Sequence, residues 1–374
     1  MDKKFVMGIA AMAALTLVSC SSDDLDSLSD NSSKNEAISF DGYLGRSAVA
    51  VNGTRGSVET KETLRTKGFG VFGKYDAGDG KTSDSKFFVN QKVTCSNSKW
   101  TYTPLKYWPT QGQINFYAYA PYKDGQALKE NTNTFDFTVE PNAADQIDLL
   151  WANAMGQIKT NFEGTTKEKV KFLFKHALSR LGYTVKLSGN YFSSDATFTL
   201  KKIALAGSPD ETKNAFYKKG TIDLSMTNNS KGLWTATTSA DNKQNFPWFD
   251  GSYIVTNSDP KHPTNSADED YSKNDYLFVI PQDFSQIKAE GHDVDELYVI
   301  VEYDVTYTSS HTTITNKVYK KLPIKFEQGK AYMLNLTIGL PIEFDIDVET
   351  VSGVEDWNEQ PDTNIDSWDD IKHE

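Results

Sequence analysis

Short alternating segments run along nearly the whole chain, and this pattern constrains the fold more than any other feature of the sequence. Apolar, β-branched and aromatic residues alternate with polar ones, and turn residues such as glycine, asparagine, aspartate and proline separate the runs. Side chains on a strand point to opposite faces in turn, whereas an amphipathic helix repeats about every 3.6 residues. Because no long segment has the helical repeat, the sequence predicts an all-β protein.

The predicted strands are spread over both halves of the chain. In the first half they lie at 38–40, 68–75, 87–94, 99–103, 114–119, 134–139, 149–152, 170–174 and 181–187. In the second half they lie at 197–205, 220–225, 233–237, 276–280, 297–308, 313–326, 331–338 and 342–348. A single helical turn is compatible with residues 176–180. Aromatic residues make up 12% of the chain and suit half-buried pleated surfaces, so we expect two β-sandwiches in series.

Composition shifts divide the chain into five expected parts. Residues 1–19 read as a signal peptide and residues 20–37 as a disordered tether rich in serine and acids. The two sandwiches are expected at 38–190 and 191–357, with an acidic tail at 358–374. The loops at 156–169 and 188–195 both qualify as the boundary, and the later one gives halves of similar length. Residues 241–274, with three prolines, read as a long insertion in the second sandwich.

The N-terminus indicates lipidation. A short positive region at Lys3 and Lys4 precedes an apolar run that is too short to span a bilayer. Leu17-Val18-Ser19-Cys20 resembles a bacterial lipobox, which implies acylation of Cys20 and firm membrane attachment by several acyl chains. The plainer alternative is an ordinary signal peptide followed by a chance cysteine.

The residues that follow point to the cell surface. The sequence SSDD at 21–24 resembles the serine-and-acid tags that export lipoproteins to the outside of the outer membrane, although it also suits a simple solvated tether. With Cys20 acylated, Cys95 has no cysteine partner, so we expect no disulfide within the chain.

Charge and motifs argue against several functions. The net charge of −12 argues against nucleic acid or anionic lipid as the main partner. The segment GFGVFG at 68–73 matches a phosphate-binding pattern by letter, but its large apolar residues predict a strand. Its glycines then mark places where an aromatic ring or another backbone packs closely.

We find no constellation of residues that would carry catalysis. The five histidines are far apart, no serine lies in a G-x-S-x-G elbow, and Cys95 has no basic neighbour in the sequence. His176, after an apolar strand, is expected to be structural. Acidic clusters such as 268–270 lack the spacing of a calcium loop. The sequence therefore predicts no enzyme activity, no catalytic residues, no cofactor and no metal site.

Several segments, taken in order, resemble the fimbrillin family, the two-domain lipoprotein subunits of type V pili. They are ISF at 38–40, GFGVFGKY at 68–75, KWTY at 99–102, KYWP at 106–109, NFYAYAPY at 115–122, LLWA at 149–152, VKFLFKHALS at 170–179, GKAYMLNL at 329–336 and VEDW at 354–357. The resemblance implies two transthyretin-like, Greek-key β-sandwiches and a subunit that polymerises by exchanging strands.

In that family an arginine-specific protease removes the first strand, and the next subunit donates a strand to the groove left behind. The removable strand here would carry Ile38 and Phe40 into the core, and cleavage would fall at Arg46 or, later, at Arg55 or Arg65. The alternative is an anchor-type subunit that stays uncut and keeps its lipid. This exchange is a form of β-augmentation, in which a neighbour's backbone completes a sheet edge.

A candidate donor strand lies near the C-terminus. Ile342, Phe344, Ile346 and Val348 alternate with acidic residues, so one face suits an apolar groove and the other suits water. The alternative is an ordinary last strand of the second sandwich.

The sequence therefore favours a structural or tip subunit of an adhesive type V pilus (fimbrium), anchored as an outer-membrane lipoprotein at the cell surface. Its expected partners are other fimbrillin subunits in a homo- or heteropolymer, an arginine-specific protease, the outer membrane through the lipid, and host or bacterial surface ligands. The alternative function is a surface lipoprotein that binds a glycan or a protein and never polymerises. Residues 241–274 would then carry the binding.

Overall fold

The computed structural model describes residues 37–44, 58–78, 81–159, 169–189, 195–226, 233–237, 239–255, 276–286, 294–339 and 344–350. Most of these residues lie in strands, which confirms the all-β prediction. Among them, α1 (Lys61–Lys67) is an α-helix, and 3-10 turns lie at Ala143–Asp145 and Ala240–Asn242. The helical turn predicted at 176–180 is absent, because two strands run up to residues 177 and 178 from either side.

No helix in the described part of the chain combines the length and the apolar character that crossing a membrane requires.

The strands in the first half are β1 (Phe40–Leu44), β2 (Phe69–Asp76), β3 (Asp84–Ser96), β4 (Lys99–Thr101), β5 (Gln113–Ala120), β6 (Thr134–Thr138), β7 (Leu150–Gln157), β8 (Val170–His176) and β9 (Ser179–Leu187). Those in the second half are β10 (Ala196–Ala206), β11 (Phe216–Tyr217), β12 (Lys219–Asp223), β13 (Trp234–Ala236), β14 (Lys243–Gln244), β15 (Phe246–Val255), β16 (Leu277–Val279), β17 (Gln282–Asp283), β18 (Tyr298–Tyr307), β19 (Thr312–Lys321), β20 (Lys325–Phe326), β21 (Ala331–Ile338) and β22 (Asp345–Thr350).

The first sandwich is made from one hydrogen-bonded sheet that folds over itself. Its strand order is β1-β8-β7-β5-β2-β3-β4, and β8 pairs with β7 at only two positions. The β1–β8 pair is thereby free to turn across the remaining strands. Its aromatic side chains meet those of β3 and β5, as the contacts of Phe40 with Phe88 and Phe116 show. An aromatic core therefore fills the space between the two layers.

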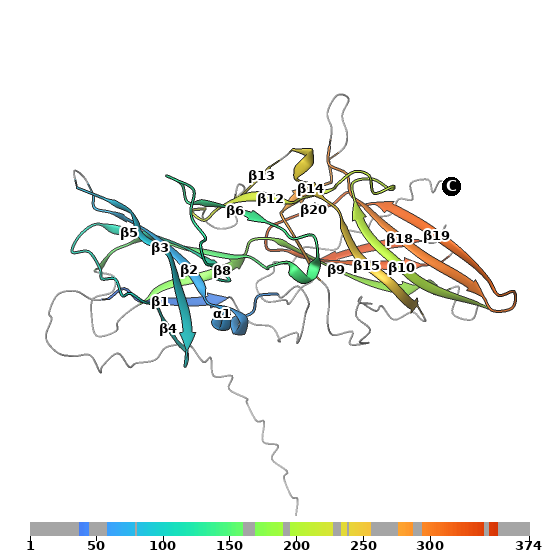
Figure 1. Cartoon of the computed structure of the whole chain (residues 1–374), viewed down its shortest axis with the longest axis horizontal. Helices are drawn as coiled ribbons and strands as arrows, with labels where there is room; N and C mark the ends of the chain where they lie inside the picture. The colour runs from blue at the N-terminus through green and yellow to red at the C-terminus, as the bar shows by residue number, and fades with distance from the viewer. Residues whose placement is uncertain are drawn as a thin grey trace, which may run out of the picture.

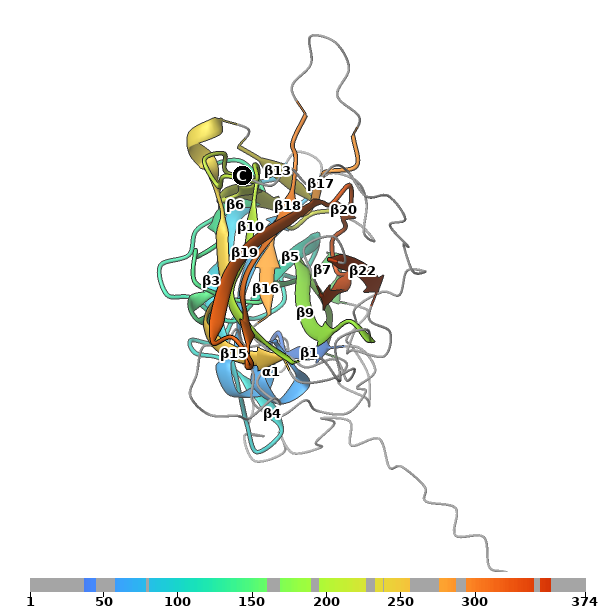
Figure 2. The ribbon, with the colours of Figure 1, turned by 90° about the vertical axis from the view of Figure 1, so that its right-hand side faces the viewer.

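The second sandwich has two separate four-stranded sheets, β15-β10-β18-β19 and β16-β9-β21-β22. In the end-on view of Figure 2, β10 and β19 lie on one side and β9 and β22 on the other. Apolar side chains from both sheets, among them Leu200, Val301, Leu334 and Ile346, belong to one buried cluster between them. Figure 1 shows the two sandwiches at opposite ends of the long axis, with β6, β12 and β13 between them.

Hydrogen bonding crosses the boundary predicted at residue 190. β9 pairs with β21 and β16, and β6 pairs with β12, so two strands of the first half lie in sheets with the second half. The larger apolar cluster also includes Phe72, Tyr119 and Trp151 from the first half. The two sandwiches are therefore packed against each other through shared apolar residues.

The glycine-rich segment at 68–73 contains the start of β2, and aromatic rings of the neighbouring strands pack closely against its glycines, as predicted. A Cβ on Gly70 would lie 2.4 Å from Cε1 of Tyr119, and one on Gly73 would lie 2.8 Å from Cδ2 of Phe88. Both rings fill the space that a side chain would need, so these glycines serve packing.

The insertion predicted at 241–274 is wrong over its first part. Residues 243–255 form β14 and β15, and β15 is a full member of the β10 sheet. Trp248 and Phe249 are buried in the core. The prolines misled the prediction because Pro247 lies near the start of an edge strand, where the missing N–H is tolerated. Residues 256–274 lie outside the described residues.

Candidate assembly site

The first described strand, β1, fills a groove in the first sandwich with its alternate side chains. Ile38, Phe40 and Leu44 are 1%, 1% and 5% exposed, and Gly42 lies between the last two on the same face. This alternation is the period of a strand with one face in a core. The sequence predicted that Ile38 and Phe40 point into the core, and the structure places both there.

Backbone hydrogen bonds hold β1 from both sides. β1 pairs in parallel with β8 along its length, and the Val170 N–H donates to the Ser39 carbonyl at 2.9 Å. On the opposite side the Ile38 N–H donates to the Lys106 carbonyl at 2.8 Å. The start of β1 is thus inserted between β8 and the segment that follows β4.

Tyr102 fixes the start of the strand from within the core. Its hydroxyl donates to the Ile38 carbonyl at 2.8 Å and accepts the Lys106 N–H at 3.3 Å. Burial raises the pKa of the Tyr102 phenol to about 12, so the hydroxyl keeps its proton and remains a donor over the physiological range.

Phe40 occupies an aromatic pocket made by strands that follow it in the chain. Its ring centroid lies 5.2 to 5.7 Å from those of Phe88, Tyr102, Phe116 and Phe172. Aromatic pairs at such separations add to the stabilisation that burial alone provides. The pocket therefore recognises a large, flat side chain at this position.

At Gly42 the groove narrows to a constriction. A Cβ at this position would lie 2.9 Å from Cε1 of Phe69, 3.4 Å from Trp100 and 3.5 Å from Phe174. Phe69 is fully buried, and its ring packs against Trp100 and Phe174 at centroid distances of 4.9 and 5.2 Å. The Phe69 ring would have to shift to admit a Cβ here, and it packs against two other rings, so a residue larger than glycine disturbs this core.

The chain between β1 and β2 carries the predicted cleavage sites. Arg46 and Arg55 lie outside the described residues, and Arg65 lies within α1, which packs through the buried Leu64. The sequence contains one more arginine, Arg180, which is 3% exposed at the start of β9. Three of the four arginines therefore lie between β1 and β2, and the fourth is buried.

A buried polar cluster anchors the chain just before α1. Asp148 accepts hydrogen bonds from the Glu59 N–H at 2.8 Å and pairs with Nδ1 of His176 at 2.9 Å. Glu59 also pairs with Lys67 at 2.5 Å, and burial raises the pKa of its carboxyl. His176 is therefore the satisfied structural histidine that the sequence predicted. Sequence reasoning missed this cluster because its members are far apart in the chain.

The candidate donor strand is a member of the second sandwich. β22 pairs antiparallel with β21, and Phe344, Ile346 and Val348 are 2%, 0% and 4% exposed in the core. Lys320 of β19, in the opposite sheet, forms an ion pair with Asp345 at 2.8 Å. Ile342 lies outside the described residues. The apolar face that the sequence predicted exists, and this chain's own core already covers it.

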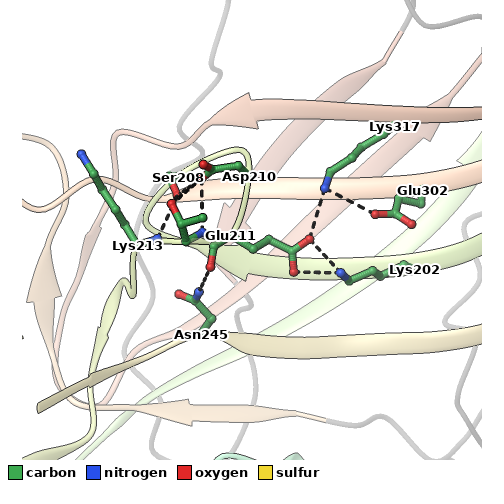
Figure 3. A network of polar contacts seen from close by, with 9 residues as sticks. Lys202, Ser208, Asp210, Glu211, Lys213, Asn245, Glu302 and Lys317 are labelled. Carbon is green, nitrogen blue, oxygen red and sulfur yellow. Dashed lines mark hydrogen bonds and ion pairs between the residues drawn. The ribbon is translucent and has the colours of Figure 1, made fainter. Parts of the chain in front are cut away.

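A loop of this same chain contacts polar side chains of the β10 sheet (Figure 3). Glu211, in the loop after β10, accepts two hydrogen bonds from Lys202, at 2.7 and 2.8 Å, and pairs with Lys317, which also pairs with Glu302 at 3.5 Å. Hydrogen bonds from Ser208 and Thr212 lower the pKa of Asp210 to about 2, so its carboxyl is ionised at neutral pH. A small buried cluster that includes Ala204, Ala206 and Ile300 lies on this sheet.

The predicted lipidation residue, Cys20, lies outside the described residues, as do the rest of the tether up to residue 36 and the acidic tail. The last residue assigned to the tether, Ala37, forms an antiparallel bridge with Tyr107. Among the residues described, no cluster of histidine, cysteine, aspartate and glutamate side chains has an arrangement that could hold a metal ion.

Comparison with known proteins gives three matches that agree with one another. A family model described as fimbrillin-like matches residues 54–357. The fimbrium subunit Fim1C of Phocaeicola vulgatus is 26% identical over 400 residues, and the alignment covers 96% of this chain and 97% of that protein. The crystal structure of a fimbrial protein from Bacteroides vulgatus has a TM-score of 0.58 at 19% identity, covering 86% of this chain and all of that one. At this identity the structural likeness shows the fold.

Proposed function

This chain belongs to the fimbrillin-like family, and on that premise we propose that it is a structural or tip subunit of an adhesive type V pilus at the cell surface. Its assembly would follow the loss of β1 and the entry of a donor strand from another fimbrillin subunit. The chemistry is that of β-augmentation: the donor's backbone replaces the hydrogen bonds of β1, and its alternate side chains refill the core.

The observation that carries this proposal is the position of β1. The strand contributes Ile38, Phe40 and Leu44 to the aromatic core, yet it lies before every other described strand in the chain. One cut in the segment 45–57 would separate it from the rest of the sandwich. A groove lined by buried aromatic rings is then left without its apolar filling, and a new strand in that place restores the burial.

The arginine positions support an arginine-specific protease as the trigger. Surface loops are the preferred sites of proteolysis, and a buried residue in a strand resists it. Arg180 is buried, so cleavage after arginine in the folded chain is confined to the region of Arg46, Arg55 and Arg65. Of these three, Arg65 lies in a packed helix, where a protease would have to unfold the chain before cutting it.

What remains after cleavage would stay folded at its new end. Residues 58–60 are tied to the body of the molecule by the Glu59–Asp148 hydrogen bond and by α1, whose first turn is capped by Thr60. A cut at Arg46 or Arg55 would therefore release β1 without loosening β2.

Before assembly, Cys20 would carry the lipid that holds the chain at the outer membrane, as its lipobox-like context indicates. The alternative of a non-polymerising binding protein receives less support. It assigned the binding to residues 241–274, and two of the aromatic residues in that range, Trp248 and Phe249, are buried.

The experiment that tests the proposal is to determine the N-terminal residue of the mature protein by mass spectrometry of the surface fraction of native cells. We expect a start at Ser47 or Gly56, with a start at Thr66 as the less accessible third option. An acylated Cys20 on every molecule would contradict the strand-exchange mechanism for this chain and would favour an anchor subunit or a monomeric binding protein.

A further inference from the structure

At the Gly42 position the groove that holds β1 has no room for a side chain. This limit on side-chain size restricts which strand can replace β1, and therefore which partner can donate it. The inference rests on the proposed function, because it concerns the strand that replaces β1. We infer that the donor comes from a different subunit, one that carries glycine where Gly42 now lies and a large aromatic residue two positions away.

The first candidate is this chain's own segment 342–348, which runs into β22, because its sequence is similar to that of 38–44. Both segments read Ile-x-Phe-Asp, at 38–41 and 342–345, and Val348 takes the place of Leu44. An alignment of the two segments matches the apolar residues at three of the four inward positions. On sequence alone, a second copy of this chain would be the expected donor.

The fourth inward position rejects β22. In the same alignment Ile346 falls at the Gly42 site, where even a Cβ would lie 2.9 Å from Cε1 of Phe69. Reversing the strand direction about the same four sites brings Phe344 there, which is larger still. Moving the register by two residues brings either Phe344 or Val348 to the site. Overpacking a core in this way is destabilising, because Phe69, Trp100 and Phe174 would have to move out of their packed positions.

The rest of the C-terminal sequence does not offer a better segment. Gly353 is the only glycine after residue 339, and the residues two positions to either side of it are Val351 and Glu355. A donor centred on this glycine would place Glu355 at the Phe40 pocket or at the Leu44 site. An unpaired carboxylate in that aromatic core would be strongly unfavourable.

A second observation, independent of the first, also argues against β22 as the donor. The strand is hydrogen-bonded to β21 at six register positions, and Phe344, Ile346 and Val348 are buried in the second core. Donating it would open the subunit's own core, whereas a donor held outside its own fold has no such cost. Both observations point to a segment with the inward pattern apolar, aromatic, glycine, apolar on another subunit.

The test is competition among peptides for the emptied groove. The full chain is cut in the segment 45–57 with an arginine-specific protease. A labelled peptide of residues 37–44 is then bound in the emptied groove, and its displacement by unlabelled competitors is followed by fluorescence anisotropy. The competitors are unlabelled 37–44, its Gly42→Val variant, the peptide of residues 341–349, and the Ile346→Gly variant of that peptide. An Asp347→Gly variant of 341–349 is the matched control, since it adds the same backbone freedom at an outward position.

We expect 37–44 to compete and its Gly42→Val variant to be weaker by about 10-fold or more. The 341–349 peptide and its Asp347→Gly control should compete poorly, and Ile346→Gly should improve competition by about 10-fold. If unmodified 341–349 binds as tightly as 37–44, the inference is overturned and a second copy becomes the donor. If 37–44 neither leaves the cut chain nor rebinds, strand exchange itself fails, and the inference falls with the proposed function.

Discussion

The segment 38–44, which contains β1, and the segment 342–348, which runs into β22, share a sequence pattern and differ in how the fold uses them. Both read Ile-x-Phe-Asp at their start and then alternate apolar with polar residues, and Phe40, Leu44, Phe344, Ile346 and Val348 are all buried. β1 precedes every other described strand in the chain, and the segment 45–57 that follows it contains two arginines. β22 follows β21 after a short connection and completes a sheet whose other strands precede it in the chain.

An alternating apolar strand can be exchanged only if its connection and its groove allow it. In the proposed mechanism, one chain break near β1 would release the strand, while Glu59, Asp148 and α1 would keep the new end in place. Near β22, both neighbours in the structure, β21 and the opposite sheet with Lys320, belong to the same folded unit. Under the proposed function, replacement would suit the first strand, and permanent membership in its sheet would suit the last.

The largest expected effect comes from removing the aromatic anchor of β1. Phe40→Ala should lower the free energy of unfolding by about 3–5 kcal/mol, because it empties a pocket lined by four rings. Phe344→Ala in β22 should cost a similar amount in the intact chain, measured by urea denaturation of both variants.

After cleavage in the segment 45–57, the two variants should separate. Phe40→Ala should then speed the loss of residues 37–44, and Phe344→Ala should leave that rate at the wild-type value. Equal rates of strand loss in both variants would mean that β1 is not held by its own side chains, and would contradict the distinction drawn between β1 and β22.

A smaller effect is expected from the hydroxyl that fixes the start of β1. Tyr102→Phe leaves the ring in the pocket and removes the donor to the buried Ile38 carbonyl, at a cost of about 1–3 kcal/mol. The measurement is hydrogen exchange, in which the amides of residues 38–44 should lose protection before those of β22. Tyr303→Phe, which removes a buried hydroxyl donor to the Gly339 carbonyl in the second sandwich, is the matched control and should spare β1.

The smallest effect is expected from the ion pair on β22. Lys320→Met removes the contact with Asp345, which is 45% exposed, so the stability should fall by about 1 kcal/mol or less. Lys321→Met, whose partner Glu296 lies away from β22, is the control. Protection of the β22 amides should persist in both variants. If the β22 amides lose their protection in Lys320→Met and keep it in Lys321→Met, the ion pair with Asp345 holds this strand, and β22 is more easily released than its burial indicates.

Much of the fold was predictable from local sequence, because strand formation leaves a short-range signal. The alternation in 38–40, the glycines of 68–73 and the apolar run of 170–174 each identify a strand and its inward face, and the structure has strands at all three places. The helix α1 was missed because its seven residues give too few turns for a periodic pattern.

For the candidate assembly site, the sequence predicted the strand but not the groove that receives it. The sequence identified Ile38 and Phe40 as inward residues, since their own spacing carries that information. The groove that receives them was not predictable, because Phe69, Trp100, Phe116 and Phe172 lie on four different strands and meet only through the sheet topology. The Asp148–His176–Glu59 cluster was hidden for the same reason.

Local sequence was enough to predict that this chain is an all-β protein, where most of its strands lie and which faces of those strands are apolar, although it missed β14 and β15. Those properties follow from the period of two along a strand, so a few consecutive residues suffice to show them. Only the tertiary structure decided that Gly42 is a constriction, that Arg180 is buried and that β22 completes its own core. Each of these depends on contacts between residues far apart in the chain, and such contacts exist only once the layers have packed.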